Sequence, residues 1–226
     1  MGNVAFEAFP KIPRLNRNIT ITEKIDWTNA AVVIVPLAEI DHIAYSHTDS
    51  IDLFEPAHSA LIARVGDFFV FAQSRNRFIT PGADNYGFAR WVQANAEALV
   101  TTLGPGRHFG EWWGSGIQRG YGLTKGDKRF SLFNTGRWST EALPVGLPAL
   151  GLVPTLYSGP FDQLAIDLAV ANLDVDGSVA AEGYDNPEGI VVWHEAARQS
   201  FKVLLEGDAV HKGAAGHALD EEKVAA

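Results

Sequence analysis

The chain has 226 residues, 46% of them hydrophobic, which is the profile of a globular protein of one or two domains. The net charge of −9 argues against a protein that grips nucleic acid over its whole surface, and the absence of cysteine excludes a disulfide framework, a thiolate metal site and a cysteine nucleophile. No run of about 18 uncharged apolar residues occurs and the first residues lack the apolar core of a signal peptide, so we expect a cytoplasmic protein.

Apolar and polar side chains alternate over residues 19–25, which predicts a β-strand. The isoleucines share one face of this strand, and Lys24 lies on the other. Short apolar or alternating runs predict further strands at 30–37, 66–75, 108–114, 128–134, 188–193 and 201–206.

Two segments show helical spacing. We expect one helix over 86–104, capped by Asp84 or Asn85 and ended by Gly104-Pro105, and a second over 161–173, where Leu164, Ala165 and Leu168 fall together. Strands and helices mix without a strict β-α-β alternation and without a glycine-rich phosphate loop. This pattern indicates an α+β fold built on antiparallel sheets with flanking helices. The apolar face of the first helix comprises Phe88, Val92, Ala96, Leu99 and Leu103.

Basic side chains gather in one segment of this acidic chain. Residues 141–226 carry 14 acidic and 4 basic side chains, whereas residues 107–137 carry six basic and two acidic ones. A basic strip of this kind can meet a phosphate backbone. A solvated surface with uneven charge explains the composition equally well.

Six short motifs follow one another along the chain: EKIDWTN (23–29), SRN (74–76), FGEWWG (109–114), KRFSLFN (128–134), EGIVVW (188–193) and FKVLLE (201–206). This series resembles the covalent nucleotidyltransferase superfamily of ATP-dependent ligases and capping enzymes, and within it the nick-sealing type of ATP-dependent RNA ligase. Six motifs in the right order are far more specific than any one of them. The resemblance implies an ATP-grasp-like ligase adenylation domain over residues 1–211, without an OB-fold. Residues 212–226 are rich in Ala, Gly and charge, and we expect a disordered tail there.

The resemblance assigns the covalent chemistry to three residues. Lys24 takes the place of the nucleophile that attacks the α-phosphorus of ATP and forms a lysyl–AMP phosphoramidate. Glu188 takes the place of a carboxylate that serves the metal ion and the reacting phosphate. Lys202 matches a cation that neutralises charge developing on that phosphate. The implied cofactors are ATP and Mg²⁺ (or Mn²⁺).

Other matched positions contact the nucleotide in the family. Glu111 stands where the ribose is contacted, and Phe130 stands where an aromatic ring stacks on adenine, with Val191 as the apolar cover on the other side of the base. Taken one by one, these residues are also typical of surface carboxylates and core apolar positions. Their joint order favours the nucleotide-binding interpretation. The remaining matched positions are Glu23, Asn29 and Arg75.

Two positions depart from the family pattern. Trp27 replaces the glycine of the nucleophile motif, where a residue without a Cβ leaves space beside the nucleotide. Leu204 replaces a second lysine that many relatives carry two residues after the first. We expect the indole to obstruct the pocket in part, so that Trp27→Gly speeds lysine adenylylation without a large gain in stability.

The resulting hypothesis is a monomeric, ATP-dependent ligase of RNA ends or nicked duplexes. The similarity of FEAFPKIPR and EKIDWTNAAV to RNA ligases favours RNA as the substrate, which the strip over 107–137 and the pair Arg14 and Arg17 would hold. A DNA ligase and a GTP-using capping enzyme are the alternatives among enzymes. A pseudo-ligase that binds nucleotide or RNA but is disabled by Trp27 is the alternative among binding proteins.

Overall fold

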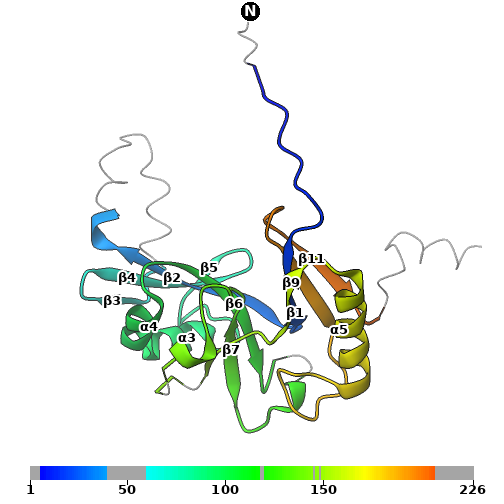
Figure 1. Cartoon of the computed structure of the whole chain (residues 1–226). Coiled ribbons are helices and arrows are strands. Elements are labelled where there is room, and N and C mark those ends of the chain that lie inside the picture. Colours follow the sequence, from blue (N-terminus) through cyan, green and yellow to red (C-terminus); the bar gives the residue numbers. More distant parts are fainter. Residues whose placement is uncertain (1–5, 40–59, 118–119, 145, 148, 207–226) are drawn as a thin grey trace, which may run out of the picture. The chain divides into compact units, whose positions relative to one another are not determined.

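The computed structural model describes residues 6–39, 60–117, 120–144, 146–147 and 149–206 (Figure 1). The chain divides into two compact units. Unit 1 comprises Met1–Lys24, Thr155–Asp176 and Glu188–Ala226, and unit 2 comprises Ile25–Pro154 and Gly177–Pro187. Each unit holds one β-sheet with helices on it, which confirms the predicted α+β class. The expected tail at 212–226 lies outside the described residues.

Unit 1 is a four-stranded antiparallel sheet with one helix on it. The strand order is β11-β10-β1-β9, with β1 at Asn18–Lys24, β9 at Thr155–Pro160, β10 at Gly189–His194 and β11 at Gln199–Leu204. Ile19 and Ile21 of β1 are fully buried against α5 (Gln163–Asp176), as the alternation over 19–25 predicts. The strands expected at 188–193 and 201–206 are therefore confirmed.

Helix α5 buries a different face from the one that the sequence indicated. Its buried residues are Ile166, Ala169 and Leu173, whereas Leu164 and Leu168 are exposed. The helix is apolar on both faces, so its periodicity alone does not say which face meets the sheet. The helix also extends to Asp176, three residues beyond the predicted end.

Unit 2 is a seven-stranded sheet in the order β3-β4-β2-β6-β7-β8, with β5 paired to β4. Every pairing is antiparallel except that of β7 with β8. The sequence predicted the four long strands and missed the short ones. The bounds are β2 Thr28–Pro36, β3 Ala63–Val65, β4 Phe68–Ser74, β5 Phe78–Ile79, β6 Gly106–Gly114, β7 Lys128–Leu132 and β8 Leu150–Leu152.

The helix predicted over 86–104 is two helices, α3 (Phe88–Ala94) and α4 (Ala96–Leu103). Asn95 interrupts them, because its side-chain amide donates to the carbonyl of Trp91 and its backbone leaves the helical region. The Asp84 carboxylate accepts the N–H groups of Ala89 and Arg90, which confirms it as the capping side chain. The predicted apolar face packs into the core on one side of the sheet.

Two short 3₁₀ helices, Gly120–Gly122 and Thr140–Ala142, complete the regular structure of unit 2. None of the helices described here has the length and apolar character needed to span a bilayer.

Gly189 begins β10 opposite Lys24, and its backbone requires a residue without a side chain. Its φ is +146°, and a Cβ there would lie 2.2 Å from the carbonyl oxygen of Val203. We expect Gly189→Ala to lower the free energy of unfolding by about 1–3 kcal/mol. Urea denaturation checks this, with Gly82→Ala as the control, because a Cβ at Gly82 meets nothing within 4 Å. Equal stability of the two variants would contradict the expectation.

Candidate active site

The open face of the unit 1 sheet carries the residues that the sequence assigned to covalent chemistry. Strand alternation places Lys24 on the face opposite the buried isoleucines. Val191 lies directly across from Lys202 in the pairing of β10 with β11, so both side chains share one face. Val191 also pairs with Thr22 of β1, two residues before Lys24 on the same face. Lys24, Val191 and Lys202 therefore project from the face that α5 leaves uncovered.

Lys24 and Glu188 form an ion pair in which Nζ of the lysine donates to Oε2 of the carboxylate. Glu188 immediately precedes β10, and its carbonyl accepts the N–H of Leu205, which holds the backbone beside the sheet. Both side chains are mostly buried, with 23% and 22% exposed. The ion pair fixes the position of the Lys24 amine beside a carboxylate.

Glu23 and Leu204 lie on opposite faces of the unit 1 sheet. Glu23 is buried on the isoleucine side of β1, so its side chain points to the face opposite Lys24. Leu204 pairs with Gly189, which in turn pairs with Lys24, so the leucine stands two strands away from the nucleophile on the open face. The position where many relatives carry a second lysine is therefore on the Lys24 face but apolar.

Unit 2 brings a second set of assigned residues into one row across its sheet. Asn29 of β2 pairs with Glu111 of β6, Glu111 pairs with Ser131 of β7, and Ser131 pairs with Gly151 of β8. Ser74, the last residue of β4, pairs with Ala30 of β2. Arg75 is the next residue after Ser74 and so lies beside Asn29, at the opposite end of the row from Gly151. Residues paired across strands point to the same face of the sheet. We call this set the Glu111 row.

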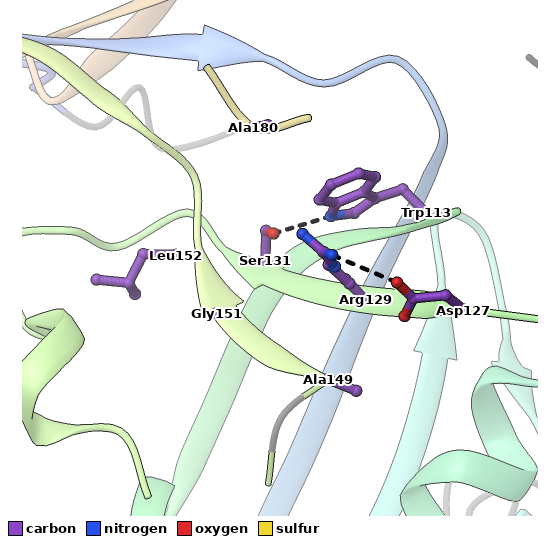
Figure 2. A pocket seen from close by; sticks show the side chains of 8 residues that line it. All are labelled: Trp113, Asp127, Arg129, Ser131, Ala149, Gly151, Leu152 and Ala180. Atoms are coloured by element: carbon purple, nitrogen blue, oxygen red, sulfur yellow. Dashed lines mark hydrogen bonds and ion pairs between the residues drawn. The ribbon is translucent and has the colours of Figure 1, made fainter. Parts of the chain in front are cut away.

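A cavity of about 460 Å³ adjoins the Glu111 row on the same face of the sheet (Figure 2). Ser131 and Gly151 belong both to the row and to the lining of the cavity. The Ser131 hydroxyl accepts the indole N–H of Trp113, and the Arg129 guanidinium lies 5.4 Å from the centre of the Trp113 ring. Arg129 also pairs with Asp127 at 3.3 Å.

Phe130 cannot stack on a nucleotide in this structure. Its ring is completely buried in the core on the helical side of the unit 2 sheet, where it packs against Phe88 at 4.9 Å between ring centres. The side chain that reaches the Glu111 face is Phe133, three residues later and 40% exposed. Its N–H donates to the carbonyl of Phe109, which extends the β6–β7 ladder and keeps Phe133 on the face of Glu111 and Ser131.

The two phenylalanines of KRFSLFN are expected to respond differently to truncation. Phe130→Ala should lower the free energy of unfolding by about 3–5 kcal/mol, the usual cost of removing a buried phenylalanine. Phe133→Ala should leave stability almost unchanged and raise the apparent KM for ATP, because stacking acts in the ground and transition states alike. Urea denaturation and initial rates of AMP-adduct formation separate the two effects. A stable Phe130→Ala with a raised KM would restore the assignment made from the sequence.

Trp27 is a packing residue of unit 2. Its ring meets the edge of Tyr121 with 5.6 Å between centres, and it packs against two of the buried core clusters. The Tyr121 hydroxyl accepts the N–H of Asp26, next to the indole. The indole N–H is buried without a hydrogen-bond partner, which costs about 1–3 kcal/mol. The structure therefore gives the indole a stabilising role that the sequence did not indicate.

Trp27→Gly is accordingly expected to destabilise the protein. Removal of a buried tryptophan costs about 3–5 kcal/mol, and because Trp27 is only partly buried we expect the lower end of that range. Trp27→Phe should recover part of the loss, since it keeps an aromatic ring beside Tyr121. Denaturation curves measure the stability, and adenylylation rates taken well below the midpoint test for obstruction. A glycine variant as stable as the parent would show that the indole contributes no net packing.

No group of three or more His, Cys, Asp or Glu side chains suited to a metal ion occurs among the described residues. His108 is buried and bonded to the Gly104 carbonyl at 2.9 Å, and burial lowers the pKa of its ring. The ring of His108 therefore bonds the backbone at the end of α4.

The RNA ligase family model matches residues 17–204. The chain belongs to the RNA ligase family. The match covers five of the six motifs in full and the first four residues of the sixth, so the family prediction is confirmed. No curated protein sequence matches this RNA ligase family member.

Solved structures of a Naegleria gruberi RNA ligase share the fold of this family member. A variant with ATP and Mn aligns with a TM-score of 0.54 and 18% identity, over 92% of this chain and 53% of that one. A second variant, with AMP and Mn, aligns with a TM-score of 0.53 and 18% identity, over 84% of this chain and 50% of that one. The structure with PPi aligns with a TM-score of 0.52 and 17% identity, over 92% of this chain and 52% of that one. The chain spans about half the length of these structures, and the likeness supports the predicted nucleotidyltransferase fold.

Proposed function

We propose that this member of the RNA ligase family is an ATP-dependent RNA ligase that acts through a lysyl–AMP intermediate. Nζ of Lys24 attacks the α-phosphorus of ATP, the N–P bond forms, and the bond to the pyrophosphate leaving group breaks while the amine loses its proton. An RNA 5′-phosphate oxygen then attacks the same phosphorus and releases the lysine. A 3′-OH finally attacks the activated 5′-phosphate and expels AMP.

The observation that carries this proposal is the Lys24–Glu188 ion pair on the open face of the unit 1 sheet. The carboxylate holds the amine in one place and is a nearby acceptor for the proton that must leave before nitrogen attacks. Lys202 stands on the same face, where a fixed cation stabilises charge that develops on a phosphate.

We assign the ATP nucleoside to residues of the Glu111 row and to Phe133. The Glu111 carboxylate is a hydrogen-bond acceptor suited to ribose hydroxyls, and Asn29 beside it supplies both a donor and an acceptor. The exposed ring of Phe133 replaces Phe130 as the stacking partner of adenine. Arg75 is exposed at the end of the row, where its guanidinium suits a phosphate or an RNA end.

Glu188 fits a divalent cation whose other ligands are phosphate oxygens of the nucleotide. Glu188 is a single carboxylate beside Lys24, and Mg²⁺ is usually bound by one or two carboxylates together with substrate phosphates. When bound, the ion supplies positive charge that stabilises the reacting phosphate. Glu188 would hold this ion beside Lys24.

We infer that the RNA is held in part by the basic strip. Five basic residues of the strip lie among the described residues, namely Arg107, Lys125, Lys128, Arg129 and Arg137, and Arg119 lies outside them. The Arg137 guanidinium stacks on Trp138 at 4.7 Å and donates to the Leu103 carbonyl, so this cation is partly fixed. Binding of this kind depends steeply on salt. A cytoplasmic location stays a prediction from the sequence.

One experiment separates the ligase from the alternatives. The chain is mixed with ATP and Mg²⁺, its intact mass is measured, and nicked RNA and nicked DNA duplexes of one sequence are then supplied. An AMP adduct followed by sealing of RNA in preference to DNA supports the proposal. Sealing of DNA alone would identify a DNA ligase, and an adduct with GTP alone a capping-type enzyme. The lack of any adduct would favour the pseudo-ligase, for which Trp27 and Leu204 are the reasons.

A further inference from the structure

The segment that leads into β1, residues 6–17, carries four large apolar side chains in the open. We call it the arm. Phe6, Phe9, Ile12 and Leu15 are 61 to 93% exposed, so none of them packs on the chain's own surface. In Figure 1 the arm is a drawn-out trace that runs away from β1. Burial of large apolar side chains is favourable, so an uncovered row of them indicates a docking segment.

The arm has a period of three residues. This is the repeat of a polyproline II helix, which Pro10 and Pro13 favour, and it divides the segment into three ridges. The first ridge is apolar and the second holds the prolines. The third ridge is basic and exposed, and consists of Ala8, Lys11, Arg14 and Arg17.

Helix α5 of the same unit presents the complementary feature. Leu164, Leu168 and Val175 are 51 to 80% exposed and follow one another at helical spacing on the face turned away from the sheet. We call these residues the α5 stripe. The helix contains no basic residue, and exposed acidic side chains border the stripe: Asp162, Asp167, Asp174 and Asp176. The α5 stripe is thus an apolar surface bordered by acidic side chains, and the arm is an apolar ridge beside a basic ridge. The two surfaces are complementary in charge.

The base of the arm is anchored beside the start of α5, and in this conformation the arm does not fold back along that helix. The Arg17 carbonyl accepts the N–H of Phe161, just before α5, and His194 Nε2 bonds the Leu15 carbonyl at 2.7 Å. The arm therefore leaves the unit close to the start of α5 without lying on it. Within the described part of one chain, both apolar lines are exposed.

We propose that the arm docks on the α5 stripe of a second copy of this chain. Each copy supplies both surfaces, so two reciprocal contacts close a symmetric dimer. The basic ridge of one copy faces the acidic borders of the other, which fixes the register and makes association sensitive to salt. This departs from the monomer expected from the sequence, and it is independent of the reaction the protein catalyses.

The experiment measures the solution mass of the full chain by light scattering over a range of concentrations. We expect a dimer that dissociates on dilution and at high salt. Phe6→Ser with Phe9→Ser, and separately Leu164→Ser with Leu168→Ser, should each give half that mass at every concentration. Val179→Ser is the control, because Val179 is 63% exposed but belongs to neither surface. Circular dichroism checks that each variant remains folded.

Mixing the two variants tests the pairing itself. The leucine variant retains an intact arm and the phenylalanine variant retains an intact stripe, so the mixture should recover a weaker dimer with one contact. A parent protein that is monomeric at all concentrations would overturn the proposal. So would a dimer that either variant leaves intact, or a mixture that recovers nothing. A monomer whose arm variant loses only RNA binding would instead assign the arm to RNA.

Discussion

Lys24→Ala is expected to abolish the AMP adduct while the fold stays intact. No other nitrogen can replace the amine, because formation of the N–P bond requires an unprotonated nucleophile at that position of the sheet. Lys24→Arg should fail as well, since a guanidinium stays protonated at any accessible pH. The measurement is intact mass after incubation with ATP and Mg²⁺, with thermal denaturation as the test of folding.

The same variant can still be tested on RNA that already carries a 5′-adenylate. If Lys24 serves only as the nucleophile, Lys24→Ala should seal such RNA at a substantial fraction of the parent rate, because that step breaks a bond to AMP and needs no lysyl–AMP. Loss of both activities would mean that the lysine also positions the substrate. An adduct on the alanine variant would place the nucleophile elsewhere and remove the basis of the proposed function.

The strands could be predicted from the sequence wherever one face of a sheet is polar. The alternation over 19–25 places Lys24 correctly because burial of Ile19 and Ile21 leaves the other face to polar side chains. The four long strands of unit 2 could be predicted because each is a run of several apolar or alternating residues. The short strands were missed because two or three residues carry no periodicity, and the break at Asn95 was missed because an asparagine amide competes with the helix only in the right local geometry.

The buried face of a strand or helix was harder to predict than the position of that strand or helix in the sequence. In KRFSLFN, Phe130 and Leu132 alternate with Arg129 and Ser131, so the polar face was visible in the sequence, and Phe133 falls on it by spacing alone. The family motif drew attention to the first phenylalanine instead. Helix α5 presents the opposite difficulty, because both of its faces are apolar and only the sheet beneath it decides which one is buried.

Glu188→Ala is expected to slow adenylylation by about 100-fold or more and to change its dependence on Mg²⁺. The carboxylate touches the nucleophile directly and is the only acidic partner that the described structure gives Lys24. In the proposed mechanism, its removal takes away the group that positions the amine, the nearest acceptor for the amine proton and the residue that would hold the cation. Glu195→Ala is the matched control, because Glu195 is an exposed acid at the other end of β10.

Glu188→Gln separates these contributions, because the amide keeps the size of the side chain and its hydrogen-bonding oxygen but loses the charge. If charge on the carboxylate is what matters, the glutamine variant should be nearly as slow as the alanine variant, and excess Mn²⁺ should recover little. If Glu188 only positions Lys24, glutamine should restore much of the rate at ordinary Mg²⁺ concentrations. Rates equal to those of the Glu195→Ala control would show that the ion pair has no part in the reaction.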